Sequence, residues 1–323
     1  MKLKTLAKVS IVFIVIGFIL TGIGYAINRE FNVRGFNINI SAPSNKNQNN
    51  NKHINLITKA KELEAFKNID IDTNVSDIKI IPSDKYKIEL KYKEDEVLEY
   101  ELKDSTLFVK QDYEYKLDKN KNEDSINEIK IYIPKNANMD NIIINSMVSD
   151  INLKSFEIKD FRLYNKVGDI DINDLNIDNF YLESDVGSVN ISNASIGKGE
   201  VYLNIGEAYL NNINSKTFKA HSKVGDVDLS KSNIANKLDI KSGVGDININ
   251  TKAFGDIDIK GGTSDIEVSI NDKEEIYNYN LDCNVGDIEV DGKAYEKDLK
   301  VNNNTKNNID INCTTGSVEL NFD

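Results

Sequence analysis

A short motif recurs along the chain at an almost fixed interval. Nine segments of the type V-G-D-I-x-I place a central Gly or Ser at positions 149, 168, 187, 206, 225, 245, 264, 286 and 316. The gaps between them are 19, 19, 19, 19, 20, 19, 22 and 30 residues, and an earlier copy, NVSDIKI, centres on Ser76. A fixed period of this size indicates a solenoid, in which each repeat forms one coil and stacks on its neighbours.

Apolar and polar residues alternate on both sides of the central residue, which is the period of a β-strand. Apolar residues recur seven, five and one position before it and two and four positions after it, and we expect all five columns to face inward. Stacking equivalent strands about 4.8 Å apart buries these columns and pairs the backbones. The sequence therefore predicts an all-β fold, a parallel β-solenoid with coils of about 19 residues. Nine coils would form a rod about 40 Å long.

A leucine-rich-repeat horseshoe has a comparable period. It needs ordered leucines and an asparagine ladder, which are missing here, and the return segments of this chain, such as NDLNIDN, are polar and short. A solenoid made only of strands and turns fits better.

The repeats occupy residues 141–323, and the segments around them differ. Residues 54–140 contain alternating strands without the 19-residue period, and they predict an antiparallel β cap region over the N-terminal end of the stack. The long gap between positions 286 and 316 predicts a loop or short helix that shields the last coil.

The N-terminus carries an uncharged apolar run at residues 9–27, close to the roughly 20 residues that cross a bilayer. Lys2, Lys4 and Lys8 precede it, which predicts a cytoplasmic tail at residues 1–8, a single transmembrane helix, a polar tether at 28–53 and an extracytoplasmic C-terminal domain. A cleaved signal peptide is the alternative, because Gly24-Tyr25-Ala26 loosely fits a cleavage site.

The composition argues against two classes of function, nucleic-acid binding and catalysis. The 52 acidic and 40 basic residues give a net charge of −12, which disfavours binding to nucleic acid. The chain has two histidines, no tryptophan and none of the common hydrolase or phosphate-binding motifs, so we expect no enzymatic activity and no cofactor. The alternative from the enzyme class is a carbohydrate-active β-helix enzyme, which would need clustered carboxylates beside Arg or Lys.

The V-G-D-I repeats, the T-L-x-V stretch at residues 106–109, the I-x-I-Y-I-P stretch at 129–134 and the N-terminal run carry a family resemblance. Together they resemble the bacterial "putative-adhesin" family of domains of unknown function, of the Lia type, over about residues 60–323. The resemblance implies a β-solenoid and a place in the cell envelope, beside envelope-stress functions. It implies no catalytic or binding residues.

An aspartate follows the central residue in most repeats, and these form a column: Asp150, Asp169, Asp226, Asp246, Asp265 and Asp287. Stacked carboxylates repel one another, and a hard cation such as Ca²⁺ would relieve that repulsion. The alternative is that each Asp is a turn residue whose carboxylate accepts hydrogen bonds from backbone amides.

Two further groups are candidates. Aromatic and cationic residues should meet on one outer strand face: Arg162, Tyr164, Tyr181, Tyr202 and His221. Such a patch suits contact with a glycan or peptide, although tyrosine is also a favoured strand residue.

Cys283 and Cys313 share one inward register, so they form either a disulfide or two buried thiols. The prediction is a non-catalytic cell-envelope protein that presents a repetitive β-solenoid surface for binding, as an adhesin or in the response to envelope stress. Its partner is an unidentified envelope component or protein.

Overall fold

The computed structural model describes residues 55–94, 96–112, 127–253 and 255–322, which belong to one compact unit, His53–Asp323. The predicted cytoplasmic tail, membrane anchor and tether lie outside the described residues. No helix within those ranges is long and apolar enough to cross a membrane.

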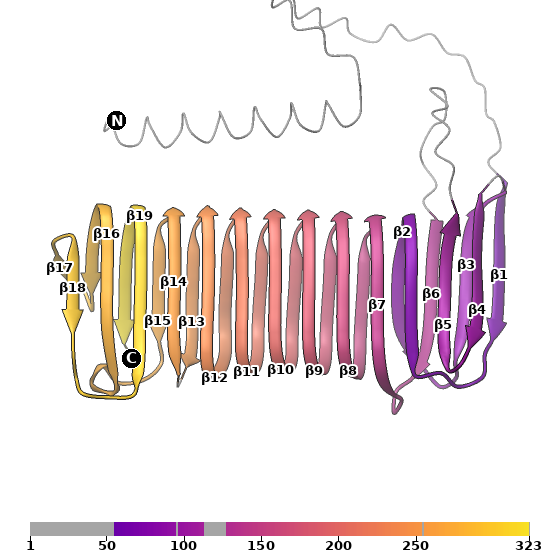
Figure 1. Ribbon diagram of the computed structural model, residues 1–323, viewed down its shortest axis with the longest axis horizontal. Helices are drawn as coiled ribbons and strands as arrows, with labels where there is room; N and C mark the ends of the chain where they lie inside the picture. Colours follow the sequence, from indigo (N-terminus) through magenta and orange to yellow (C-terminus); the bar gives the residue numbers. More distant parts are fainter. Residues whose placement is uncertain (1–54, 95, 113–126, 254, 323) are drawn as a thin grey trace, which may run out of the picture. The chain divides into compact units, whose positions relative to one another are not determined.

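Strands make up nearly all of the described chain (Figure 1). The N-terminal strands are β1 (Leu56–Glu62), β2 (Asn68–Ser83), β3 (Lys87–Lys93), β4 (Val97–Lys103), β5 (Thr106–Asp112), β6 (Asn127–Pro134) and β7 (Asn138–Val148). The central strands are β8 (Ile151–Val167), β9 (Ile170–Val186), β10 (Val189–Ile205), β11 (Ala208–Val224), β12 (Val227–Val244), β13 (Ile247–Ala253), β14 (Asp256–Thr263) and β15 (Ile266–Ile270). The 3₁₀ helix η1 (Glu274–Ile276), β16 (Tyr277–Val290), β17 (Lys293–Tyr295), β18 (Asp298–Val301) and β19 (Asn307–Phe322) follow.

Each of β8 to β12 is one complete coil that bends around the stack and pairs with the next coil in parallel. The register advances by one repeat at each step: Ile170 lies opposite Ile151 on one side and opposite Val189 on the other. The predicted parallel β-solenoid is therefore confirmed, and Figure 1 shows its coils lying side by side.

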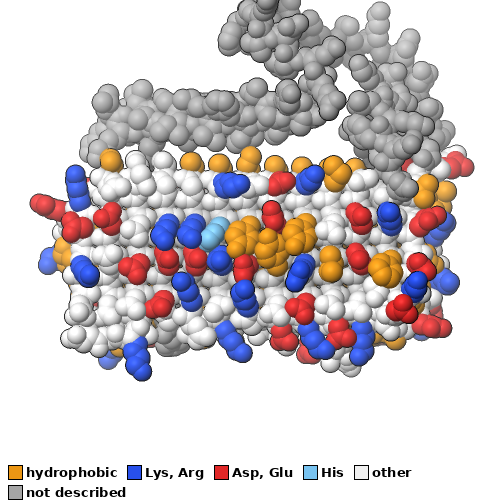
Figure 2. Space-filling view, in the orientation of Figure 1, with side chains coloured by type: hydrophobic (Ala, Val, Ile, Leu, Met, Phe, Trp, Pro, Cys, Tyr) orange, Lys and Arg blue, Asp and Glu red, His pale blue; other side chains and the backbone are white. Residues whose placement is uncertain are grey.

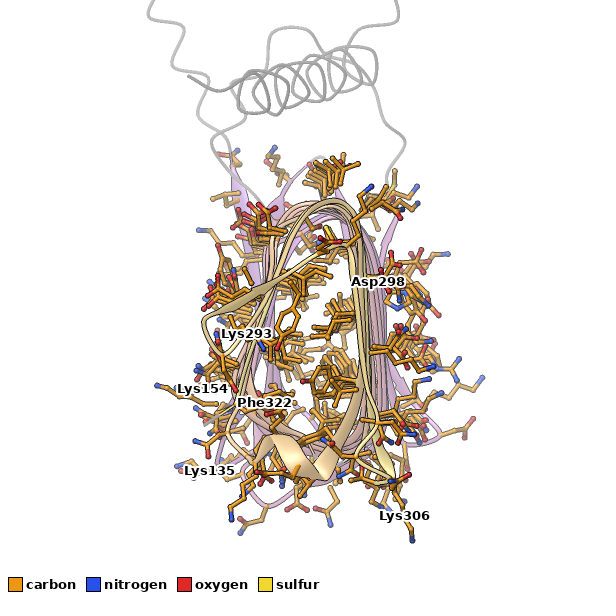
Figure 3. The ribbon with its side chains drawn as sticks, turned by 90° about the vertical axis from the view of Figure 1, so that its left-hand side faces the viewer. Lys135, Lys154, Lys293, Asp298, Lys306 and Phe322 are labelled. Atoms are coloured by element: carbon orange, nitrogen blue, oxygen red, sulfur yellow. The ribbon has the colours of Figure 1, made fainter. Side chains whose placement is uncertain are left out.

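Seen along the stack in Figure 3, a coil is a flattened loop whose two walls enclose the core. In the β9 coil the first wall is residues 170–177 and the second wall is residues 180–186. The predicted inward columns seven and five residues before the central residue, and two and four after it, are buried; Phe180, Leu182, Ile170 and Ile172 are each at most 2% exposed. This packing of identical columns, rather than any local motif, holds the coils together.

The predicted inward column one residue before the central residue is wrong. Val148 and Val167 are 44% exposed and Val285 is 53% exposed. The chain already turns at these positions, so the alternation stops at the third residue before the central residue and resumes at the second residue after it. The valines thus line the outer edge of the bend.

The return segments, which the sequence shows as polar and short, contribute two more buried columns. Leu175 is 3% exposed and Ile177 is 1% exposed, although both fall out of phase with Ile170 and Ile172. The cause is Asp174, which adopts a left-handed conformation with φ 57° and shifts the alternation by one residue. The equivalent residues of other coils do the same: Ser155, Asn193, Asn212 and Lys231.

The copy centred on Ser76 is a true coil within the predicted cap region. Its strand β2 pairs in parallel with β7 and β8 on one side and with β5 and β6 on the other. Antiparallel pairs β4–β5, β3–β6 and β1–β3 then close this end, as the sequence predicts. The edge strand β1 places Lys59 opposite Leu90, with its Nζ 5.3 Å from the centre of the Tyr92 ring. An exposed lysine on an edge strand protects that edge from pairing with another chain.

The C-terminal coils do not stack in chain order. The chain passes through β16, turns through the short strands β17 and β18, and returns as β19, which lies between the β14/β15 coil and β16 (Figure 1). The predicted loop or short helix between positions 286 and 316 is therefore wrong. Those residues include two strands that pair antiparallel with β16 and cover it, while η1 precedes β16.

Candidate functional site

Four rings form a continuous row on the second wall, which we call the aromatic strip: Tyr164, Tyr181, Tyr202 and His221. They come from β8, β9, β10 and β11, and successive ring centroids lie 5.5, 5.6 and 5.5 Å apart. The coil register explains the row, because Tyr202 lies opposite His221 and Tyr181 lies one coil away on the neighbouring outward column. The structure therefore brings together the four rings that the sequence singled out.

Figure 2 shows hydrophobic side chains gathered beside the histidine in the middle of this face. Tyr164 is 38% exposed, and Tyr181, Tyr202 and His221 are half-buried. The rings present their remaining surface to solvent without any strand edge nearby, since each of β8 to β11 is paired on both sides.

Carboxylates hold the two central tyrosines. The hydroxyl of Tyr181 donates to Oε2 of Glu183 at 2.8 Å, and that of Tyr202 donates to Oε2 of Glu200 at 2.7 Å. The pKa of both phenols is raised above the usual value. Burial is the largest cause and these hydrogen bonds are the second. Both tyrosines are therefore neutral at physiological pH, and their rings are fixed in orientation.

His221 ends the strip and is tied to the next coil. Its Nε2 lies 2.9 Å from Oδ1 of Asp239. Burial lowers the pKa of His221 below 6.5, and the hydrogen bond to Asp239 opposes that shift without cancelling it. The imidazole is therefore mostly neutral at pH 7.

Cations lie at both ends of the strip. Arg162, which the sequence predicts in this patch, lies opposite Tyr181 and two residues from Tyr164 on the same strand. The sequence analysis missed Lys166, on the other side of Tyr164, and Lys219, whose Nζ lies 5.9 Å from the centre of the Tyr202 ring. The sequence signal for both was their spacing. Each lies two residues from a ring on the same strand, and residues two apart on a strand point to the same face.

The Asp column forms a ladder between coils. In five of the six aspartates, the Oδ1 atom accepts a hydrogen bond from the backbone N–H of the equivalent residue in the next coil. The donor–acceptor distances are 2.9 Å for Asp150 with Asp169, 2.8 Å for Asp169 with Ser188, 2.7 Å for Asp226 with Asp246, 2.9 Å for Asp246 with Asp265 and 2.9 Å for Asp265 with Ser317. Among the described residues, no group of three or more His, Cys, Asp or Glu side chains is placed to hold a metal ion. The geometry supports the structural interpretation of this column.

Removing one of these aspartates should therefore lower the stability of the fold by the same amount with and without Ca²⁺. We expect Asp246→Ala to lower the free energy of unfolding by about 1 kcal/mol, because the N–H of Asp265 loses its acceptor. Thermal unfolding with and without millimolar Ca²⁺ checks this, with Asp287→Ala as the control in the outermost coil. A melting temperature that Ca²⁺ raises in the parent but not in Asp246→Ala would contradict it.

Cys283 and Cys313 lie opposite each other on β16 and β19, as predicted, and both are buried free thiols. The Sγ atoms of Cys283 and Cys313 donate to the carbonyl oxygens of Gly316 at 3.4 Å and Ser264 at 3.3 Å. Ser222 and Ser242 make the equivalent bonds in earlier coils, to the carbonyls of Gly206 and Gly225. Burial raises the pKa of Cys313 to about 12, so the thiol is unreactive in the folded chain.

Serine should replace both cysteines at little cost under reducing conditions. We expect the Cys283→Ser, Cys313→Ser double variant to unfold within about 1 kcal/mol of the parent, because serine donates to the same carbonyls elsewhere in the stack. Urea unfolding measures this. The disulfide stays a prediction, and a deficit of about 2–4 kcal/mol that appears only without reductant would reveal it.

A family model described as toastrack DUF4097 matches residues 66–321, which run from just before β2 to the end of β19. The chain belongs to the toastrack DUF4097 family. The family resemblance predicted from the repeats is thereby confirmed, and the toastrack match includes the β2 coil and the inserted C-terminal coil.

Several solved structures align with this chain at low sequence identity. A "putative adhesin" from Bacteroides fragilis is 14% identical, with 82% of this chain and 97% of that chain covered and a TM-score of 0.42. A "putative adhesin" from Parabacteroides distasonis is 13% identical, with 83% and 98% covered and a TM-score of 0.38. A "putative lipid binding protein" from Parabacteroides distasonis is 12% identical, with 82% and 96% covered and a TM-score of 0.41. The search of curated proteins found no match.

Proposed function

We propose that this toastrack chain is a non-catalytic cell-envelope protein that binds an envelope component through the aromatic strip. The observation that carries the proposal is the unbroken contact of four rings across four successive coils. Tyrosine supplies a large contact area at a low entropic cost, because few side-chain torsions must be fixed. Here the hydrogen bonds to Glu183 and Glu200 lower that cost further.

The location rests on the N-terminal sequence. Residues 9–27 would hold the chain in the membrane as a single-pass anchor, and the polar residues 28–53 would give the solenoid reach on the outer side. The proposal therefore places the aromatic strip outside the cytoplasm, where an envelope component is accessible.

The carboxylates near the strip favour binding over hydrolysis. A glycoside hydrolase needs one carboxylic acid with a raised pKa that can donate a proton. Hydrogen bonds from Lys198 and Tyr202 lower the pKa of Glu200. Burial alone would raise the pKa of Asp239, but His221 and nearby lysines outweigh it and lower the value. Both groups therefore stay ionised and serve as hydrogen-bond acceptors.

Retention of the detergent-solubilised full-length protein by detergent-washed envelopes tests the proposal, since detergent keeps residues 9–27 from inserting into a membrane. We expect the Tyr181→Ala, Tyr202→Ala pair to weaken retention at least about tenfold, since truncated aromatic anchors commonly cost more than 1 kcal/mol. Tyr209→Ala is the matched control, because Tyr209 is a 41% exposed tyrosine of β11 on the first wall whose hydroxyl also bonds a glutamate, Glu207. Equal retention of the pair and the parent would remove the aromatic strip as the binding site.

A further inference from the structure

The charges around the aromatic strip are arranged by position along the stack. Arg162 and Lys166 lie two residues either side of Tyr164, and Lys219 and Lys223 lie two residues either side of His221. In the next coil Lys241 lies opposite His221. The rings at the two ends of the strip, Tyr164 and His221, are thus flanked by cations. Figure 2 shows basic side chains beside the histidine.

The two central rings have a different setting. Their close neighbours are Glu183 and Glu200, which are occupied by the tyrosine hydroxyls. The middle of the strip thus holds two neutral tyrosines and their glutamate partners, of which Glu200 also pairs with Lys198 and Lys219. The exposed cations Arg162, Lys166 and Lys223 lie toward the two ends. Three strand spacings separate β8 from β11, so the ends lie about 14 Å apart.

Several of these cations are free to bind a ligand. Arg162, Lys166 and Lys223 are exposed and form no ion pair with any described carboxylate. By contrast, Lys219 lies 4.0 Å from Glu200, and Lys241 lies 3.5 Å from Asp239. In a chain with a net charge of −12, unpaired cations at both ends of one strip attract an anion to a surface that would otherwise repel it.

The wall also limits how a ligand can be held. A peptide that adds to a sheet needs an unpaired strand edge, and each of β8 to β11 is paired on both sides. Recognition must therefore use side chains: ring faces, carboxylates that accept hydrogen bonds from hydroxyls, and cations.

We propose that the ligand of the aromatic strip is an anionic polysaccharide that lies along the stack. Its uncharged sugar faces pack on Tyr181 and Tyr202, and acidic groups on sugars farther along the polymer pair with Arg162 and Lys166 at one end and with Lys223 at the other. This rests on the proposed function, whose binding surface it uses, and adds the chemical class of the ligand.

Binding of the full-length protein in detergent to defined polymers tests the inference. The probe is hyaluronan, in which acidic and neutral sugars alternate. The comparison polymers are hyaluronan with its carboxylates reduced to alcohols, and poly-glutamate, which has charge but no sugar rings. We expect hyaluronan to bind, the other two to bind at least about tenfold more weakly, and hyaluronan binding to weaken as salt rises from 20 to 200 mM, since exposed charges are screened over about 10 Å at 0.1 M.

Charge variants supply the second readout. We expect the Arg162→Gln, Lys223→Gln pair to weaken hyaluronan binding about tenfold. The matched control is the Lys154→Gln, Lys216→Gln pair, which removes the same charge from exposed positions of the same two strands away from the strip. Figure 3 shows Lys154 pointing outward from the first wall.

The outcomes separate the two proposals. Equal binding of reduced hyaluronan or of poly-glutamate would overturn the anionic polysaccharide, as would equal effects of the two charge pairs. Failure to bind hyaluronan, while Tyr181→Ala, Tyr202→Ala still weakens envelope retention, would overturn the ligand class and leave the proposed function standing. Retention that ignores the tyrosines would overturn both.

Discussion

Replacing Gly187 with alanine is expected to lower the free energy of unfolding by about 3–5 kcal/mol. Gly187 has φ 135°, which is unfavourable for a residue with a Cβ, and a Cβ there would lie 2.1 Å from the carbonyl oxygen of Gly168 in the preceding coil. Neither backbone can retreat, because both belong to a continuous parallel ladder. Urea unfolding followed by circular dichroism measures the loss.

Gly292→Ala separates the two causes of this loss, which are the unfavourable φ and the clash of the added Cβ with the neighbouring coil. Gly292 also has a positive φ, 75°, but the nearest atom to an added Cβ is Oε1 of Glu289 at 4.0 Å. Conformational strain alone should cost about 1 kcal/mol there. Equal losses for the two variants would contradict the view that the bends are stacked too closely for any side chain.

Ending the chain after Lys306 is expected to unfold both neighbours of β19 locally. The missing strand pairs with β14 and β15 on one side and with β16 on the other, so its loss opens two ladders rather than one. Hydrogen exchange should show loss of amide protection throughout β16, and Cys283 should become reactive to alkylating reagents.

The truncation also tests the strand order. If coils stacked in chain order, β16 would rest on β14 and β15 and keep its protection when β19 was removed. Protected β16 amides in the shortened chain would therefore contradict the order β14–β19–β16. Ile311→Ala is the milder companion, expected to cost about 2–5 kcal/mol because Ile311 is fully buried in β19.

The coil and most of its core were predictable because a period of 19 and an alternation of two together assign a face to each residue. The prediction failed where the backbone leaves the strand conformation. Val167 lies in the bend, and Leu175 follows a left-handed residue, so simple alternation gives each the wrong face. That left-handed position is filled by Ser155, Asp174, Asn193, Asn212 and Lys231. Four of these are turn-favouring Asp, Asn or Ser, but the same residue types fill the neighbouring outward positions of the strands, so they do not mark it.

The aromatic strip was predictable for the same reason as the core, since a constant register carries Tyr164, Tyr202 and His221 onto one column. Its hydrogen-bond partners were not, because Asp239 reaches His221 from the following coil. The Asp column shows the same limit: the sequence offered backbone amides only as the alternative to a cation, and the observed donors lie one coil ahead. The position of β19 was not encoded in the period, because repeats at 286 and 316 are equally good neighbours for the coil at 264.

Each central coil contacts only the coil before it and the coil after it. The number of coils therefore sets the distances between sites along the stack. Removing residues 188–206 would delete one coil, including Tyr202, and rejoin surfaces that already fit each other. Arg162 and Lys219 would then move closer by one strand spacing, about 4.8 Å. The number of coils, rather than any flexible loop, thus sets the distance between the cations at the two ends of the strip.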